Sequence, residues 1–68
     1  MISVNSSNLS AVGYNPTTET LSIEFHDGGL YEYHNVPQKI YEELMNSSSK
    51  GKYFHRFIKD YYHTIKLR

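Results

Sequence analysis

Residues 21–37 read LSIEFHDGGLYEYHNVP, and this stretch predicts a β-hairpin around which the rest of the chain is arranged. Residues 21–25 alternate apolar and polar side chains, which is the period of a half-buried strand. The segment Asp27–Gly29 contains residues that tolerate positive φ, so the chain can reverse there. Residues 30–34 form a second alternating run, which completes the hairpin.

The register of the hairpin follows from the length of its loop. A three-residue loop at Asp27–Gly29 places Phe25 opposite Tyr31 and Ile23 opposite Tyr33, with all four side chains on one face. A two-residue loop would turn the second run over, because a slip of one residue exchanges the two faces of a strand. The apolar pattern therefore favours the three-residue loop.

The other face of the hairpin carries mainly polar side chains: Ser22, Glu24, His26, Leu30, Glu32 and His34. Glu24 lies opposite Glu32 in this register, which is mildly unfavourable unless a cation is nearby. Two histidines flanking two glutamates offer metal ligands, and the same face is also a candidate interface. Flat open strands provide no surrounding groups to orient such ligands, so we predict no metal site and no cofactor.

The N-terminal part of the chain adds one strand. Residues 1–7 are polar and are expected to be flexible. Residues 8–14 form a strand in which Leu9 faces inward only if the strand bends or bulges, and Gly13 indicates close approach of another backbone. Residues 15–18, Asn-Pro-Thr-Thr, predict a turn whose asparagine side chain bonds the backbone ahead of it.

Two helices follow the hairpin. Asn35 is the candidate cap of the first, with Pro37 in its first turn and an end near Asn46. After a break at Ser47–Ser49, the second helix carries a broad apolar stripe formed by Tyr53, Phe54, Phe57, Ile58 and Tyr61. Residues 62–68 either extend this helix or fray.

These elements predict a single small α+β domain over residues 1–68. It consists of a three-stranded antiparallel meander followed by two short helices (β-β-β-α-α) packed on one sheet face. The chain has no cysteine, which excludes disulfides and thiolate zinc sites. No apolar run is long enough for a membrane span and no leader precedes the domain, so a cytoplasmic location is expected.

The net charge is zero, yet the charges are segregated along the chain. Residues 1–38 contain four acidic residues and no Lys or Arg, whereas residues 39–68 contain all seven Lys and Arg and three acidic residues. This asymmetry indicates an anionic partner for the basic half, or a dipolar molecule that stacks on itself. A core this thin is also often supplemented by oligomerisation, so a homo-oligomer is a further expectation.

The run from Ser7 to about Tyr61 resembles the KTSC domain, a small family named for its occurrence at the C-terminus of some lysyl-tRNA synthetases and also present as stand-alone bacterial and phage proteins. The resemblance is carried by Val12-Gly13-Tyr14, Leu21-x-Ile23-x-Phe25, Gly29, Tyr31-Glu32-Tyr33, Val36-Pro37, Ser49-x-Gly51-x-Tyr53-Phe54 and Ile58. It implies RNA binding as a function and brings no catalytic residues with it.

The first candidate site is the turn that leads into the second helix, formed by Ser49, Lys50, Gly51 and Lys52. A helix N-terminus offers free N–H groups and a positive dipole end, the two lysines add charge, and Gly51 lets a ligand come close. The turn is no phosphate-binding P-loop, because Tyr53 follows the Gly-Lys pair where Ser or Thr would bind magnesium. The alternative is an ordinary capped helix with solvated lysines.

A basic row continues along the predicted second helix through Lys52, Arg56, Lys59 and His63. Such rows position phosphates, and neighbouring aromatic side chains stack on unpaired bases. The alternative is the solvent face of an amphipathic helix. An aromatic rim for the same site is predicted from Tyr31, Tyr33 and Tyr53, although the hairpin register favours packing of the first two in the core with hydroxyls at its edge.

No motif predicts an enzyme, and a chain this short has little depth from which to exclude water. We therefore predict a binding module, with RNA as the first candidate partner. A small nucleotide-like ligand captured by an oligomer and a protein-interaction domain are the alternatives.

Overall fold

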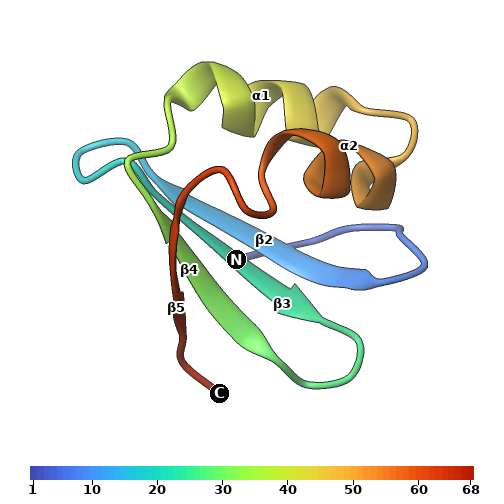
Figure 1. Cartoon of the computed structure of the whole chain (residues 1–68). Coiled ribbons are helices and arrows are strands. Elements are labelled where there is room, and N and C mark those ends of the chain that lie inside the picture. Colours follow the sequence, from blue (N-terminus) through green and yellow to red (C-terminus); the bar gives the residue numbers. More distant parts are fainter.

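The computed structural model describes all 68 residues and contains a five-stranded antiparallel sheet with two helices across one face (Figure 1). The strands lie in the sheet in the same order as in the chain. The elements are β1 Ile2–Ser3, β2 Leu9–Asn15, β3 Thr20–Phe25, β4 Leu30–His34, α1 Gln38–Asn46, α2 Lys50–Phe57 and β5 His63–Lys66. The α+β class is confirmed, but the sheet has five strands and not three.

The β3–β4 hairpin pairs two residues away from the predicted register. Ile23 lies opposite Tyr31 and Leu21 lies opposite Tyr33. A shift of two residues keeps every side chain on its face, so apolar alternation could not distinguish the two registers. The predicted partners were therefore wrong, whereas the prediction that Ile23, Phe25, Tyr31 and Tyr33 share the core-facing side is confirmed.

Turn geometry sets the register that is observed. The Phe25 N–H donates to the Gly29 carbonyl over 2.8 Å, which makes His26–Gly28 the loop and not Asp27–Gly29. Gly28 adopts φ 94°, a left-handed conformation that glycine reaches without steric cost. A three-residue loop that ends on such a glycine is a common hairpin connection.

β2 bulges between Leu9 and Ala11, and Leu9 is fully buried, as its inward position required. Residues 1–7 were assigned no strand, yet Ile2 and Ser3 form β1 and pair with β2. A Cβ on Gly13 would lie 3.1 Å from Cγ of Met1, so this glycine makes room for the N-terminal segment. The Asn15 side chain accepts a hydrogen bond from the Thr17 N–H over 3.0 Å in the predicted turn.

α1 ends at Asn46 as predicted, but Asn35 does not cap it. Asn35 adopts φ 61° and turns the chain out of β4, and Pro37 occupies the N-cap position with no side-chain hydrogen bond. Proline suits a helix start because its missing N–H would have no partner there.

α2 ends at Phe57, four residues before the predicted apolar stripe does. Asp60 adopts φ 69°, which no α-helix accommodates, and the chain turns back towards the sheet. Tyr61 is 70% exposed, so its assignment to the buried stripe was wrong.

The last residues neither extend α2 nor fray, because His63–Lys66 form β5 along the free edge of β4. The Leu30 carbonyl accepts a hydrogen bond from the Leu67 N–H over 2.7 Å, which prolongs this pairing. Figure 1 shows β5 and the C-terminus running beside β4.

The predicted opposition of Glu24 and Glu32 does not occur. Glu24 lies opposite Leu30 in the observed register. Its carboxylate pairs with the guanidinium of Arg68, whose Nε also donates to the Gly28 carbonyl over 3.0 Å. The C-terminal residue thus supplies the cation that Glu24 needs.

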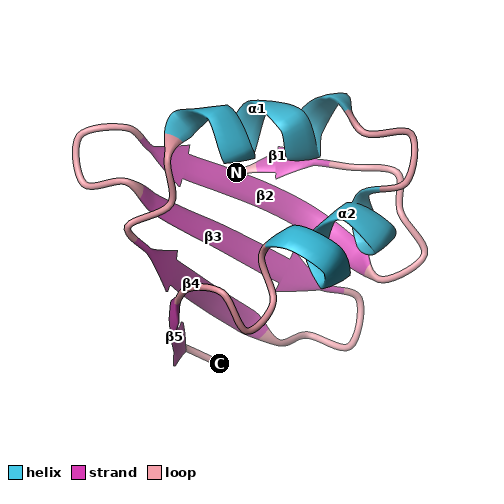
Figure 2. Cartoon of the chain, turned by 45° about the horizontal axis from the view of Figure 1, so that its top comes forward, coloured by secondary structure: helices cyan, strands magenta, loops and turns pink.

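The core lies between the sheet and the two helices, which cross β2, β3 and β4 on one side only (Figure 2). Its buried members are Leu9, Val12, Leu21, Ile23, Tyr33, Val36, Leu44, Phe54 and Ile58. The Tyr14 hydroxyl donates to the Val36 carbonyl over 2.6 Å, which fixes the start of α1 to β2. Neither helix has the length and hydropathy needed to cross a membrane.

Candidate functional site

The turn before α2 bonds mainly to itself. The Ser49 N–H donates to Ser47 Oγ over 3.1 Å, and the Ser47 hydroxyl donates to the Ser49 carbonyl over 2.9 Å. Lys50 Nζ donates to the Ser47 carbonyl over 3.2 Å. The residues of the predicted site lie together here, but the Ser49 N–H and the Lys50 ammonium already form hydrogen bonds within the protein.

The space provided by Gly51 is filled by Asn8. A Cβ on Gly51 would collide with Asn8 Oδ1 and lie 3.2 Å from Asn8 Cγ. The Asn8 side chain is held in place by Ser6, whose hydroxyl donates to Asn8 Oδ1 over 3.1 Å. Glycine at this position therefore lets the β1–β2 connection pack against the first turn of α2.

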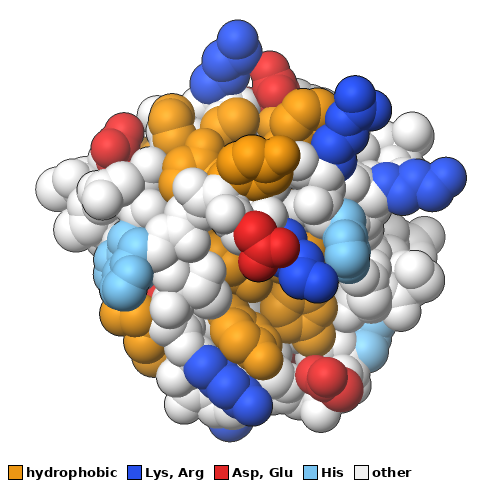
Figure 3. Space-filling model, viewed as in Figure 1, with side chains coloured by type: hydrophobic (Ala, Val, Ile, Leu, Met, Phe, Trp, Pro, Cys, Tyr) orange, Lys and Arg blue, Asp and Glu red, His pale blue; other side chains and the backbone are white.

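Lys52, Arg56 and Lys59 are exposed, and none of them forms an ion pair. Arg56 lies over the ring of Phe57, with Cζ 5.3 Å from the ring centroid. The predicted single helical row was wrong, because Lys59 follows the end of α2 and His63 belongs to β5. In the view of Figure 3, Lys, Arg and His side chains gather on the right, beside exposed hydrophobic side chains.

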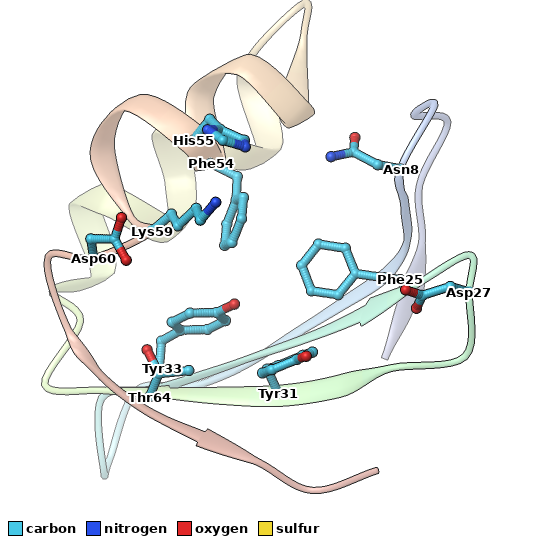
Figure 4. A pocket seen from close by; sticks show the side chains of 10 residues that line it. All are labelled: Asn8, Phe25, Asp27, Tyr31, Tyr33, Phe54, His55, Lys59, Asp60 and Thr64. Carbon is cyan, nitrogen blue, oxygen red and sulfur yellow. The ribbon is translucent and has the colours of Figure 1, made fainter.

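A groove of about 420 Å³ opens between the C-terminal half of α2 and strands β3–β5 (Figure 4). We call it the aromatic groove, because one side is formed by Phe25, Tyr31, Tyr33 and Phe54. Polar side chains line the rest: Asn8, Asp27, His55, Lys59, Asp60 and Thr64. Its volume falls within the range of small-molecule sites.

The aromatic rings of the groove hold one another in edge-to-face contacts. Phe25 meets Tyr31 with ring centroids 5.6 Å apart, and Phe54 meets both Phe25 and Tyr33 at 5.5 Å. Such contacts stabilise aromatic clusters beyond the area that they bury. The floor of the groove is therefore an extension of the core and is held rigidly.

Tyr33 is only 4% exposed, and its hydroxyl points into the groove (Figure 4). The hydroxyls of Tyr14 and Tyr53 bond to the Val36 carbonyl and to Glu43, whereas that of Tyr33 has no partner in the protein. Burial first, and then the nearby Tyr31 and Asp60, raise the pKa of Tyr33 to about 12. The hydroxyl thus stays protonated at neutral pH and can donate to a ligand.

Tyr31 and Tyr53, the other members of the predicted rim, lie in different places. Tyr31 stacks on Tyr33 at 6.5 Å in the groove, with Lys66 Nζ 5.9 Å from its ring centroid. Tyr53 lies between the helices, where its hydroxyl donates to Glu43 Oε1 over 2.7 Å. Burial and this hydrogen bond raise the pKa of Tyr53, which keeps it neutral.

Sequence reasoning did not place these groove residues in a site: Asn8, Phe25, Asp27, Phe54, His55, Asp60 and Thr64. Phe25 and Phe54 were assigned to the core, and they do contact it. Thr64 reaches the groove only because β5 returns to the sheet. The adjacent β-branched residues Thr64 and Ile65 were the one signal that could have indicated this strand.

The histidines on the outer side of the hairpin do not gather into a metal centre. His26 Nε2 lies 2.9 Å from the Ser6 carbonyl, and His34 Nε2 lies 3.2 Å from Glu32 Oε1. His63 lies opposite His34, with ring centroids 5.9 Å apart. No three metal-ligating side chains come close enough together to hold an ion.

Comparison with known proteins agrees on one family. A profile described as the KTSC domain matches residues 5–62. A KTSC domain protein from Yersinia pestis, known from a crystal structure, superposes with a TM-score of 0.94 at 33% identity and covers 97% of this chain and 93% of its own. A protein of Stutzerimonas stutzeri is 34% identical over 58 residues, which is 85% of this chain and 82% of that protein.

Larger proteins contain a related segment. A lysine–tRNA ligase of Nostoc sp. strain PCC 7120 is 55% identical over 51 residues, which is 75% of this chain but only 9% of the ligase. A lysine–tRNA ligase of Trichormus variabilis is 56% identical over 46 residues and 8% of its length. The chain thus spans less than a tenth of these relatives, and it belongs to the KTSC domain family.

Proposed function

We propose that this domain binds single-stranded RNA and acts as a binding module without catalysing a reaction. The observation that carries the proposal is a groove with an aromatic floor beside cations that no carboxylate of the protein neutralises. Lys52, Arg56 and Lys59 would contact phosphates, and the aromatic groove would receive an unstacked base.

Separate contacts to phosphates and to bases follow from the chemistry of RNA. Phosphates are bound by exposed Lys and Arg side chains, which fix the position of the strand but do not read its sequence. Bases of single strands stack on aromatic side chains, which is worth about 1–3 kcal/mol per base. Lys59 lines the groove itself, so one side chain can bridge the two kinds of contact.

The relatives support the same class of partner. The lysine–tRNA ligases act, by their name, on an RNA, and a segment more than half identical to this chain forms part of them. An RNA-binding role for the segment would serve such a protein without contributing to its chemistry.

Fluorescence anisotropy of a labelled single-stranded RNA, measured at two salt concentrations, tests the proposal. We expect binding that weakens as salt increases, because phosphate contacts release counterions. A variant with Lys52→Ala, Arg56→Ala and Lys59→Ala should lose most of the affinity, whereas Lys39→Ala on α1 should not. Absence of binding at low salt, or binding that ignores salt and the triple substitution, would overturn the proposal.

The volume of the groove also favours a second candidate, a free nucleotide-like ligand bound by one or more copies of the chain. Such a ligand must raise the melting temperature in proportion to occupancy. A panel of nucleotides in a thermal-shift assay, with native mass spectrometry to count copies and retained ligands, separates this candidate from RNA binding.

A further inference from the structure

Tyr61 is the only tyrosine of the chain that does not pack against the core. Its side chain is 70% exposed, the largest value among the exposed large hydrophobic side chains. No other aromatic ring lies against it. The other six tyrosines lie in the core or pack against it: Tyr14, Tyr31, Tyr33, Tyr41, Tyr53 and Tyr62. The ring of Tyr61 is therefore free to contact a partner.

The turn between α2 and β5 holds the backbone of Tyr61 in place. The Tyr61 N–H donates to the Ile58 carbonyl over 3.1 Å, and Ile58 is fully buried. The next residue, Tyr62, packs against the core. Because the backbone is anchored on both sides, a partner has only the ring to order, and a tyrosine side chain has only two χ angles to lose.

Tyr61 directly follows two residues of the aromatic groove. Lys59 and Asp60 both line the groove and lie at the same end of it (Figure 4). Since consecutive Cα atoms are about 3.8 Å apart, the Cα of Tyr61 lies within about 8 Å of that of Lys59. The exposed ring is thus close to the groove, and a ligand that fills the groove can extend to it.

The charges around this turn favour an anionic partner. Residues 52–61 contain three cations, Lys52, Arg56 and Lys59, and one carboxylate, that of Asp60. The three cations are exposed and form no ion pair. A single strand of RNA presents phosphates to such cations and bases to exposed aromatic rings, so both kinds of side chain at this turn have a counterpart in one ligand.

We propose that the site accepts two consecutive nucleotides of a single strand, with one base in the aromatic groove and the next base stacked on Tyr61. Lys59, which lines the groove two residues before Tyr61, contacts the phosphate that links the two nucleotides. This inference rests on the proposed function, because it adds a second base contact to the same RNA site.

Phe57 is the other exposed aromatic residue nearby, and it is less suited to receive a base. Its ring lies against that of Tyr53, with centroids 4.7 Å apart, and Arg56 Cζ lies 5.3 Å from its centroid. A base would have to displace one of these neighbours in order to stack on Phe57. The ring of Tyr61 requires no such displacement.

Two ligands that differ by one base test the inference. A 5′-phosphorylated adenylate dinucleotide carries two bases, whereas adenosine 3′,5′-bisphosphate carries one base and the same number of phosphates. Titration of the isotope-labelled protein, followed by NMR, measures both affinities. The dinucleotide should bind about fivefold to 150-fold more tightly, which is the range that one stacked base contributes. Equal affinities would overturn the inference.

Three variants complete the test. Tyr61→Ala should abolish the advantage of the dinucleotide and leave the affinity for the bisphosphate unchanged, whereas Phe57→Ala should keep most of the advantage. Tyr61→Trp introduces the only tryptophan of the chain, and its fluorescence should respond to the dinucleotide and not to the bisphosphate. An advantage that survives Tyr61→Ala, or a tryptophan that does not respond, would overturn the assignment of Tyr61.

The melting temperature of Tyr61→Ala provides the structural control. It should stay close to that of the native protein, because substitutions at exposed positions cost little stability. A large decrease would show that the ring supports the fold, which contradicts the inference.

The outcome can be told apart from that of the proposed function. Salt-dependent RNA binding that is insensitive to Tyr61→Ala would leave the RNA-binding proposal standing and contradict this inference. If neither the dinucleotide nor a longer RNA binds at low salt, both proposals are rejected.

Discussion

The two ends of α2 both place charged side chains beside a hollow, and they differ in what their polar groups bond. At the N-terminal end, Lys50 and Ser49 bond to Ser47, and Asn8 fills the space above Gly51. At the C-terminal end, the Tyr33 hydroxyl faces the aromatic groove and has no hydrogen-bond partner within the protein. Charged side chains gave the same kind of signal at both ends of α2, and the hydrogen bonds made within the protein are what distinguish the two ends.

The largest effect should come from Phe54, which belongs to the core and to the floor of the groove at once. Phe54→Ala should lower the free energy of unfolding by about 3–5 kcal/mol, which is enough to unfold much of so small a domain. Phe57→Ala, on a side chain that is 44% exposed, should cost about 1 kcal/mol or less. Urea denaturation followed by circular dichroism measures both, and similar costs for the two would show that the groove is not anchored in the core.

A smaller effect tests the packing at the N-terminal end. Helix propensity alone predicts that Gly51→Ala would stabilise the protein by about 0.5–1 kcal/mol. We expect a loss of about 1–3 kcal/mol in the free energy of unfolding, because the new Cβ collides with Asn8. Asn8→Ala in the same chain should reverse the sign of the effect. If Gly51→Ala instead stabilised the otherwise native protein, Asn8 would not fill the space above residue 51. The N-terminal end of α2 would then again be a candidate ligand site.

Tyr33 should make stability depend on pH in the alkaline range. Its pKa is raised from 10.0 to about 12 in the folded protein, so the folded state holds the phenol proton more tightly than the unfolded state does. The corresponding stabilisation is complete below pH 10 and is lost as the pH rises from 10.0 to about 12. Denaturation at several pH values should show a smaller alkaline loss for Tyr33→Phe than for the native protein.

The smallest effect compares one lysine from each end of α2. If Lys59 contacts a phosphate of single-stranded RNA, Lys59→Ala should reduce the slope of log affinity against log salt by about 0.7. Lys50, which bonds to the Ser47 carbonyl, should change the slope little when replaced by alanine. A larger change in slope for Lys50→Ala than for Lys59→Ala would place the RNA contact at the N-terminal end of α2 and contradict our account.

The sequence was informative wherever short-range patterns determine structure. Alternation predicted the faces of β3 and β4, and the bulge that Leu9 requires is present. The hairpin register was missed because a shift of two residues satisfies the same alternation, and only the φ of Gly28 distinguishes the alternatives. Asn35 was wrongly predicted to cap α1, because a left-handed turn and a helix cap favour the same residue type.

The aromatic groove could not be predicted from the sequence, because it depends on the pairing of β5 with β4. β5 is short and exposed on every residue, so it lacks the apolar pattern of a buried strand and gains its order from the edge of β4. Without β5, neither Thr64 nor Asp60 could be placed near Tyr33. The central tyrosines were predicted as core residues with hydroxyls at its edge, and Tyr33 has that position.

Chemical-shift mapping of the labelled protein with a short single-stranded RNA tests the central claim most directly. The account predicts the largest changes at Tyr31, Tyr33 and Thr64, smaller changes at Lys52, Arg56 and Lys59, and little change at Ser47 and Ser48. Changes centred on Ser48–Gly51, or on the outer face at Glu32 and His34, would contradict it.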